Sequence, residues 1–138
     1  LHAAHVRGSP AYMAAEILLK GPEQQLPDGM SFRDKGGDER REVRLRWWDL
    51  DATTFKLAAI GIDDRLHELP DEDITTEFHY RHPTPVLFGH YWMPGEPTMT
   101  LTTAACLDFS VARKGHLTAY RWSGEAKLSA ENLVYVPA

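Results

Sequence analysis

The chain has 138 residues, of which 43% are hydrophobic and 25% charged, and its formal net charge is −5. This length fits one ordinary domain or part of a larger one, and the apolar content excludes a disordered segment. The negative charge argues against a broad nucleic-acid or anionic membrane surface, because both partners need a basic patch. The single cysteine, Cys106, excludes an intramolecular disulfide, so a reducing, cytoplasmic setting fits best.

The N-terminal part of the chain predicts a strand followed by a helix. Residues 1 to 6 are mostly apolar, like the interior of a short strand, and the chain begins without a methionine. We therefore expect the chain to be a fragment of a longer protein. Ser9 followed by Pro10 is a helix start signal with the serine as N-cap, and Gly21 stops the helix after Lys20.

The middle of the chain is polar and harder to interpret. Residues 34 to 41 are a hairpin candidate, because glycines and aspartates gather at their centre. Residues 43 to 48 alternate apolar and basic side chains, which is the pattern of a half-exposed strand. Residues 52 to 69 are ambiguous and could contain a helix. The acidic residues between 63 and 77 predict a solvated face, since they lack the spacing of a calcium loop.

The last third of the chain has the most regular pattern. Residues 85 to 88 predict a short apolar strand that ends in Gly89 and His90. Residues 104 to 111 predict a second strand, and residues 117 to 122 its hairpin partner across a tight turn. Residues 132 to 136 predict a final strand. The fold class expected from these patterns is α+β, rich in strands toward the C-terminus.

Histidines are the obvious candidates for chemistry, since imidazole is the commonest transition-metal ligand in proteins. His90 follows an apolar strand and one glycine, and we expect Gly89 to let the backbone turn sharply there or approach a ligand. His2 lies in the N-terminal strand candidate between small neighbours that leave room for a ligand. Pattern alone leaves open whether these two share a metal, because a structural or exposed role is the simpler explanation of each histidine taken alone.

Several segments follow one another in a specific order: GHYW at 89–92, ACLDFSVA at 105–112 and LTAYRWSGE at 117–125. Together they resemble the C-terminal region of calcineurin-like metallophosphoesterases, in particular a bacterial Ser/Thr-phosphatase-like subgroup. The opening LHA looks like the family's internal VHA strand, and LLKGP at 18–22 and RLRWW at 44–48 look like that subgroup's insertion. The resemblance covers nearly the whole chain, with the insertion at about residues 21–84.

The resemblance implies a fold and a metal site. The chain, residues 1–138, would be a single C-terminal portion of the four-layer α/β/β/α metallophosphoesterase fold. The parent enzyme would use two divalent cations, Mn, Fe or Zn, to hydrolyse phosphoesters by a metal-activated hydroxide. The family's ligand histidines correspond to His2 and His90, and neutral imidazole suits such metals.

The departures from the family pattern concern the rest of the active site. The family's Asp-x-His, Gly-Asp-x-x-Asp-Arg and Gly-Asn-His-Asp/Glu motifs do not occur in the chain, and we expect them upstream of Leu1. Some relatives also have a second histidine where this sequence has Trp92. Because two imidazoles without a bridging carboxylate do not hold a dinuclear centre, we expect the fragment alone to bind metal weakly or not at all and to be inactive.

Further residues are candidates for substrate binding or for supporting a ligand. Arg46 could grip a phosphate, although a strand that packs the following tryptophans into the core is the simpler interpretation. Tyr91 and Trp92 follow His90 and could form a wall of the site. Asp108 lies between apolar neighbours, so we expect it to be buried and hydrogen-bonded, supporting either a nearby loop or a ligand histidine.

Two functions from different classes remain open at this point. The first is the C-terminal part of a metal-dependent phosphoesterase whose substrate is a phosphorylated protein, a nucleotide or another small phosphoester. The alternative is a non-catalytic binding or interaction module derived from the same fold. In either case an exposed sheet edge would allow the chain to associate with itself.

Overall fold

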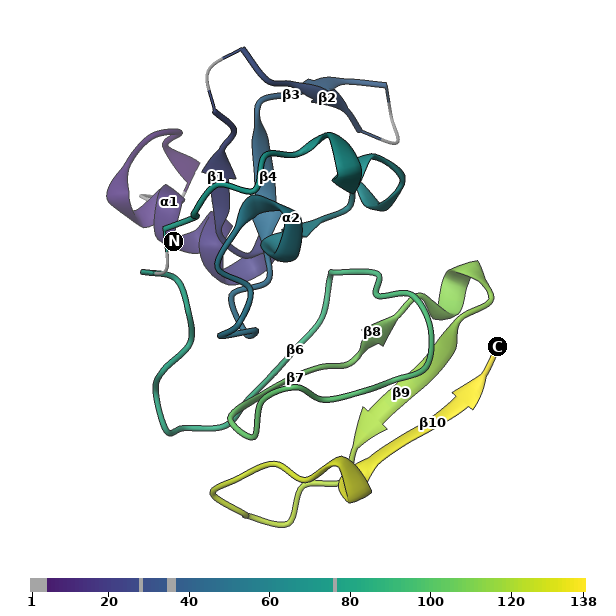
Figure 1. Cartoon of the computed structure of the whole chain (residues 1–138). Coiled ribbons are helices and arrows are strands. Elements are labelled where there is room, and N and C mark those ends of the chain that lie inside the picture. Colours follow the sequence, from purple (N-terminus) through teal and green to yellow (C-terminus); the bar gives the residue numbers. More distant parts are fainter. Residues whose placement is uncertain (1–4, 28, 35–36, 76) are drawn as a thin grey trace. The chain divides into compact units, whose positions relative to one another are not determined.

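The computed structural model describes residues 5–27, 29–34, 37–75 and 77–138 (Figure 1). The chain divides into two compact units, Leu1–His79 and Tyr80–Ala138. Its mixed composition of short strands and few helices confirms the expected α+β class. Among the described residues, no helix has the length and apolar character needed to cross a membrane.

In its described residues, the first unit contains two α-helices, five short strands and a 3-10 helix. In chain order they are α1 (Pro10–Lys20), β1 (Glu23–Gln25), β2 (Phe32–Arg33), β3 (Glu39–Arg40), β4 (Glu42–Leu45), α2 (Phe55–Ala58), β5 (Ala59–Ile60) and η2 (Asp63–Glu68). The second unit contains β6 (Val86–Phe88), β7 (Ala104–Cys106), β8 (Asp108–Phe109), η3 (Val111–Arg113), β9 (His116–Tyr120), η4 (Ala130–Asn132) and β10 (Leu133–Pro137).

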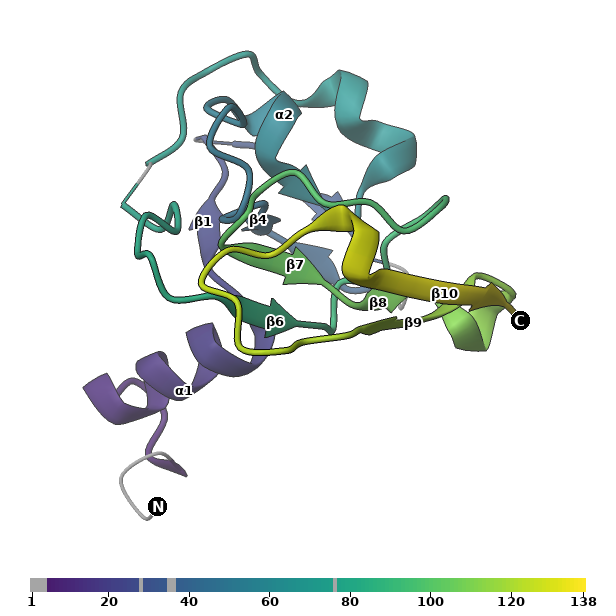
Figure 2. The same ribbon diagram turned by 90° about the horizontal axis from the view of Figure 1, so that it is seen from below.

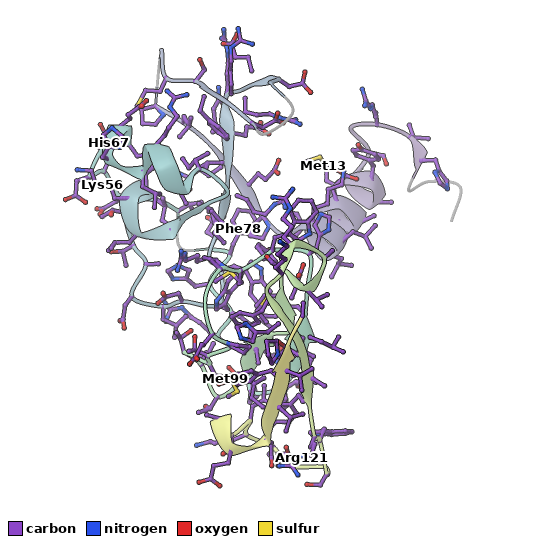
Figure 3. The ribbon with its side chains drawn as sticks, turned by 90° about the vertical axis from the view of Figure 1, so that its right-hand side faces the viewer. Met13, Lys56, His67, Phe78, Met99 and Arg121 are labelled. Atoms are coloured by element: carbon purple, nitrogen blue, oxygen red, sulfur yellow. The ribbon has the colours of Figure 1, made fainter. Side chains whose placement is uncertain are left out.

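The helix predicted near the N-terminus is confirmed as α1. The Ser9 side chain accepts a hydrogen bond from the Tyr12 backbone N–H at 3.1 Å, which makes it the N-cap. Gly21 ends the helix with φ at 87°. No residue of α1 is buried, and Met13, whose side chain is labelled in Figure 3, is 52% exposed. The expected strand over residues 1–6 was wrong at His5 and Val6, which lie in a turn, while residues 1–4 fall outside the described part.

The core of the first unit forms around the antiparallel sheet β1-β4-β5. Val43 and Leu45 on β4 are each only 1% exposed, and α2 adds the buried Phe55 and Ala58. The full set of buried residues in this cluster is Leu26, Val43, Leu45, Ala52, Phe55, Ala58, Ala59, Ile62, Leu69 and Ile74. The helix considered for residues 52–69 is therefore a single turn, followed by β5 and η2.

The strand predicted over residues 43–48 is confirmed only in its first half. β4 ends at Leu45, because the next residues enter a turn in which the Asp49 N–H donates to the Arg46 carbonyl oxygen at 3.0 Å. Trp47 and Trp48 lie in this turn with their rings in an edge-to-face contact at 5.5 Å. Trp48 still reaches the interior and is 6% exposed, so the interpretation of these tryptophans as packing residues holds for Trp48.

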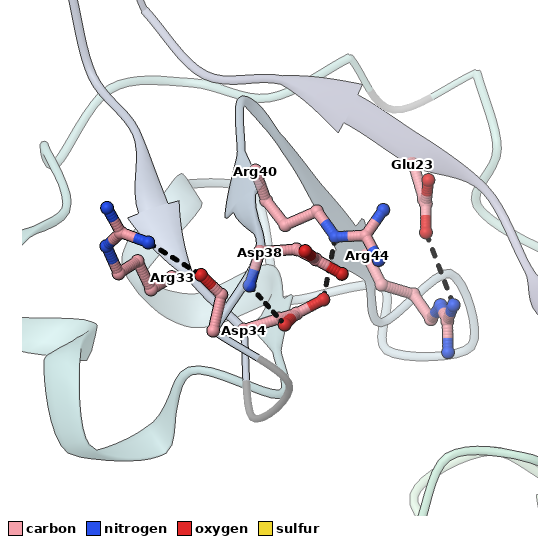
Figure 4. Close-up of polar contacts among 7 residues, drawn as sticks. Glu23, Arg33, Asp34, Asp38, Arg40 and Arg44 are labelled. Atoms are coloured by element: carbon pink, nitrogen blue, oxygen red, sulfur yellow. Dashed lines mark hydrogen bonds and ion pairs between the residues drawn. The ribbon is translucent and has the colours of Figure 1, made fainter.

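The hairpin predicted between residues 34 and 41 is present as the antiparallel pair β2–β3, with Arg33 opposite Glu39. Asp34 organises its turn, as Figure 4 shows: the carboxylate accepts from the Asp38 backbone N–H at 3.1 Å and from Arg40 Nε at 2.8 Å. Arg33 also donates to the Gly37 carbonyl oxygen at 2.7 Å. Because the ion pair is exposed, it contributes little to stability compared with the backbone pairing.

The second unit begins with β6, which pairs in parallel with β7 (Figure 2). The strand predicted over residues 104–111 was wrong in two respects, because it is broken at Leu107 and ends at Phe109, with Val111 already in η3. The Leu107 N–H still donates to the Phe88 carbonyl oxygen at 2.7 Å, and the next residue starts β8 in a different sheet. Leu107 is thus the point at which the chain passes from the parallel pair to an antiparallel sheet.

The remaining strands form the antiparallel sheet β10-β9-β8. The predicted hairpin is confirmed, with Asp108 opposite Leu117, but its connection is longer than the expected tight turn because η3 lies within it. The predicted final strand is confirmed as β10, which pairs with β9 over its whole length from Leu133 to Pro137.

Candidate functional site

His90 lies at the carboxyl end of a parallel pair of strands. β6 and β7 run in the same direction, so the segments that follow them leave at the same edge of the pair. His90 comes two residues after β6, and Asp108 comes two residues after β7. The parallel pairing of β6 with β7 therefore places His90, from the GHYW segment, and Asp108, from the ACLDFSVA segment, in one region of the second unit.

Asp108 holds this region together through its carboxylate and its backbone. The carboxylate accepts from the Trp92 N–H and from the Ser110 N–H, each at 3.2 Å. The Asp108 carbonyl oxygen accepts from the Met93 N–H at 2.9 Å, and the Ser110 hydroxyl donates to the Met93 carbonyl oxygen at 3.2 Å. Asp108 is hydrogen-bonded, as predicted, but it is only half-buried where full burial was expected, and the loop it supports is the one that contains His90. Its contacts are to backbone groups and not to the His90 ring.

The backbone around Asp108 includes several residues in the left-handed region. His90 has φ at 78°, Trp92 at 49° and Ser110 at 59°. For residues other than glycine, such conformations are destabilising by about 1–3 kcal/mol each and persist where the surroundings hold them. The sharp turn expected at Gly89 therefore occurs at His90 instead, because the carboxylate of Asp108 fixes the backbone two residues further on.

The side chains next to His90 have different environments. Tyr91 is 7% exposed and packs edge-to-face on Phe88, with ring centroids 5.5 Å apart. Trp92 is 52% exposed, and the guanidinium of Arg113 lies 4.1 Å from its ring centroid. The cation over the ring is a favourable arrangement. Tyr91 thus anchors the segment in the interior, while Trp92 and Arg113 form part of its surface.

The His90 side chain itself is exposed. An imidazole in this state is available to bind a ligand from solvent or from another chain. Within the part of the chain that the structure describes, no three His, Cys, Asp or Glu side chains gather closely enough to hold a metal ion. Among the described residues, His90 therefore belongs to no such group.

Two predicted site residues lie outside the described residues of the second unit. His2 lies outside the described residues. Arg46 belongs to the first unit, where it is half-buried and its Nε is enclosed without a hydrogen-bond partner among the described residues. The site residues that the structure does bring together are Tyr91, Trp92 and Asp108, with His90 in the same loop.

The remaining titratable groups differ in exposure. His67 and Lys56 project from η2 and α2 and are exposed (Figure 3). His79 is buried, and neither of its ring nitrogens has a hydrogen-bond partner in the described part. Cys106 is 5% exposed, and burial raises the pKa of its thiol to about 11. The thiol is therefore protonated at neutral pH, as expected for an inert buried cysteine.

Sequence reasoning missed two contributors to this region, Ser110 and Arg113. Ser110 ties the loop to β8 through its N–H and its hydroxyl. Arg113 was placed in a tight turn, although it covers the Trp92 ring. The signal in the sequence was that both residues follow Asp108 closely. That short separation does not show whether their side chains contact the loop that contains His90.

Comparison with known proteins supplies no family for the chain. No family model matches it, and no match is found among curated proteins or solved structures.

Proposed function

We propose that the chain is the C-terminal portion of a metal-dependent phosphoesterase, in the four-layer α/β/β/α arrangement, and that His90 is a ligand of one of its two cations. The observation that carries the proposal is the presentation of His90. Its imidazole is exposed at the carboxyl end of a parallel strand pair, in a left-handed backbone conformation. A ligand loop benefits from such fixation, because a rigid donor loses little entropy when it binds.

Asp108 has the role of a positioning residue in this proposal. Its carboxylate binds the Trp92 N–H, two residues after His90, and the Ser110 N–H. Tyr91 supports the loop from the interior through its contact with Phe88.

Arg113 gives the region a positive group. Its guanidinium lies over the Trp92 ring and remains exposed on one side. A guanidinium is a good partner for phosphate oxygens, so Arg113, which belongs to the same unit as His90, would assist a phosphoester bound there. Arg46 belongs to the first unit, and its predicted contact with a phosphate stays a prediction.

The metals would supply an activated water and neutralise charge on the phosphoryl group. Mn, Fe and Zn all accept neutral imidazole. His2 is the second proposed ligand of this chain. The bridging carboxylate and the remaining ligands would come from the Asp-x-His, Gly-Asp-x-x-Asp-Arg and Gly-Asn-His segments expected upstream of Leu1.

The proposal is tested first by sequencing the source gene upstream of the codon for Leu1. The three motifs in that order support a two-metal phosphoesterase. If the motifs are absent, the phosphoesterase proposal is rejected, and the alternative function, a non-catalytic interaction module, is left.

If the motifs are present, the complete gene product is assayed with p-nitrophenyl phosphate and Mn²⁺. We expect His90→Ala to reduce activity and bound manganese together, since a ligand is lost. His82→Ala is the matched control, because His82 is an exposed histidine of the same unit whose Nδ1 accepts from the Thr84 N–H at 3.2 Å. Equal activity and metal content in the two variants would contradict a ligand role for His90.

A further inference from the structure

We propose that Trp92 and Arg113 form a binding site for a phosphate ester that carries a planar aromatic group. The Arg113 guanidinium lies over the indole, 4.1 Å from the centroid of the Trp92 ring. Trp92 is nevertheless 52% exposed, so its ring keeps open surface for a second planar group. Aromatic side chains, often together with arginine, are the surfaces on which nucleic-acid bases stack in proteins.

The positive charge of this region is not neutralised within the described part of the chain. Arg113 and the neighbouring Lys114 are exposed, and neither forms an ion pair with a described carboxylate. A guanidinium that stacks on a ring presents its N–H groups at its edge, where they match the oxygens of a phosphate. The carboxylate of Asp108 is already bound by two backbone N–H groups. An anion is therefore the ligand that these cations attract.

The loops that carry the two side chains have an unusual backbone conformation. Among the described residues, the non-glycine residues with positive φ are His90, Trp92, Ser110 and Lys114. Each of them belongs either to the loop that contains Trp92 or to the loop that contains Arg113. Left-handed residues of this kind are destabilising, and they concentrate at ligand sites where the surroundings hold them in place. Their position is a second observation that points to the same two loops.

Hydrogen bonds hold the backbones of the two loops together. The Trp92 N–H donates to the Asp108 carboxylate at 3.2 Å, and the Ser110 N–H donates to the same carboxylate at 3.2 Å. The Arg113 N–H donates to the Ser110 carbonyl oxygen at 2.8 Å. The backbone is thus in place before a ligand arrives, and a preformed site loses less entropy on binding than a mobile one.

The ring and the guanidinium together select a ligand with two parts. A free phosphate would use only Arg113, and an uncharged aromatic molecule would use only the open surface of Trp92. A nucleotide or an aryl phosphate makes both contacts in one molecule, so the entropy of association is lost only once. The site needs no metal ion, and the proposal is therefore independent of the phosphoesterase function.

The first test measures binding to the 138-residue chain by isothermal titration calorimetry in metal-free buffer. The probes are AMP, phenyl phosphate, adenosine and ribose 5-phosphate. We expect AMP or phenyl phosphate to bind at least about tenfold more tightly than adenosine and ribose 5-phosphate, because only they supply both contacts. The tighter of the two identifies the source, a nucleotide or an aryl ester. Ribose 5-phosphate binding as tightly as both would indicate a simple anion site and overturn the proposal, as would no binding of any probe.

The second test uses another exposed arginine and tryptophan of the same unit as matched controls. Arg121, labelled in Figure 3, and Trp122 follow β9, whereas Arg113 precedes it. Trp122 is 64% exposed, and its Nε1 donates to the Glu125 carbonyl oxygen. We expect Trp92→Ala and Arg113→Gln each to weaken binding of the tighter probe by about fivefold or more. Trp122→Ala and Arg121→Gln should change it by less than about twofold.

A conservative variant separates stacking from a general loss of structure. Trp92→Phe keeps an aromatic ring and should retain more affinity than Trp92→Ala, with the same circular dichroism spectrum as the unaltered chain. If Trp92→Ala does not fold, Trp92→Leu takes its place in this comparison. Equal affinity of the Phe variant and the aliphatic variant, or equal losses in the Trp92 and Trp122 variants, would overturn the proposal.

Discussion

The carboxylate of Asp108 accepts a hydrogen bond from the backbone N–H of Trp92 at 3.2 Å. This contact joins the segment after β6 to the start of β8, sixteen positions further along the chain. It explains how His90 and Trp92, neither of them a glycine, remain in the left-handed region. The same carboxylate also binds the Ser110 N–H, so one side chain fixes two turns.

Replacing Asp108 should loosen both turns. Asp108→Ala removes the acceptor for two backbone N–H groups, and we expect a loss of about 2–3 kcal/mol in the free energy of unfolding, since bonds to a charged group contribute about 1.5–3 kcal/mol. Asp108→Asn keeps one acceptor oxygen and should have an intermediate effect. Urea denaturation followed by tryptophan fluorescence measures both variants. If Asp108→Asn had a lower free energy of unfolding than Asp108→Ala, this account would be contradicted.

Gly115 should be sensitive to the smallest substitution. A Cβ at this position would lie 2.0 Å from the Phe109 carbonyl oxygen, so the β8–β9 connection would have to shift. We expect Gly115→Ala to destabilise the chain by about 3 kcal/mol or more, because the clash is with backbone.

Gly124 provides the control for that experiment. It has φ at 98°, but a Cβ there would meet nothing within 4 Å. Gly124→Ala should therefore cost only the strain of the left-handed conformation, about 1–2 kcal/mol. Thermal denaturation followed by circular dichroism ranks the two variants, and equal melting temperatures would refute the role of close approach at Gly115.

Glu125 should make stability depend on pH at the acidic end. Hydrogen bonds from the Ser123 N–H, from its own backbone N–H and from the Tyr120 hydroxyl lower the pKa of this carboxyl from 4.5 to about 2. A group with a lowered folded-state pKa stabilises the protein above its unfolded pKa, and this contribution is lost as the pH falls from about 4.5 to about 2.

We expect Glu125→Gln to reduce the slope of unfolding free energy against pH in that window, as measured by urea denaturation at a series of pH values. Glu131, an exposed carboxylate at the start of η4, is the control position. An unchanged slope in Glu125→Gln, or an equal change in Glu131→Gln, would show that the Glu125 network does not produce the pH dependence.

Cys106 should react slowly with thiol reagents while the chain is folded. Its thiol is buried, and burial raises its pKa to about 11, so little thiolate is present at pH 8. Reaction with 5,5′-dithiobis(2-nitrobenzoate) should be slow in buffer and fast in guanidinium chloride. Rapid reaction under native conditions would contradict the burial of the thiol.

The elements that could be predicted from the sequence depend on neighbours along the chain. The bounds of α1 follow from the cap at Ser9 and the stop at Gly21, which act within one helical turn. The β8–β9 hairpin and β10 follow from alternation and turn residues in the same way. The importance of Asp108 could also be predicted, since a carboxylate between apolar residues needs hydrogen-bond donors.

The tertiary structure alone decided where these elements meet. The strand over residues 104–111 breaks at Leu107, whose N–H still bonds to the Phe88 carbonyl oxygen on β6, while the next residue pairs with β9. The left-handed backbone at His90 lies two residues before the Trp92 N–H, which Asp108, distant in sequence, holds. The pairing of Arg113 with Trp92 is likewise a contact between two loops. Capping and alternation are local interactions that a sequence displays, whereas these contacts exist only once the strands have paired.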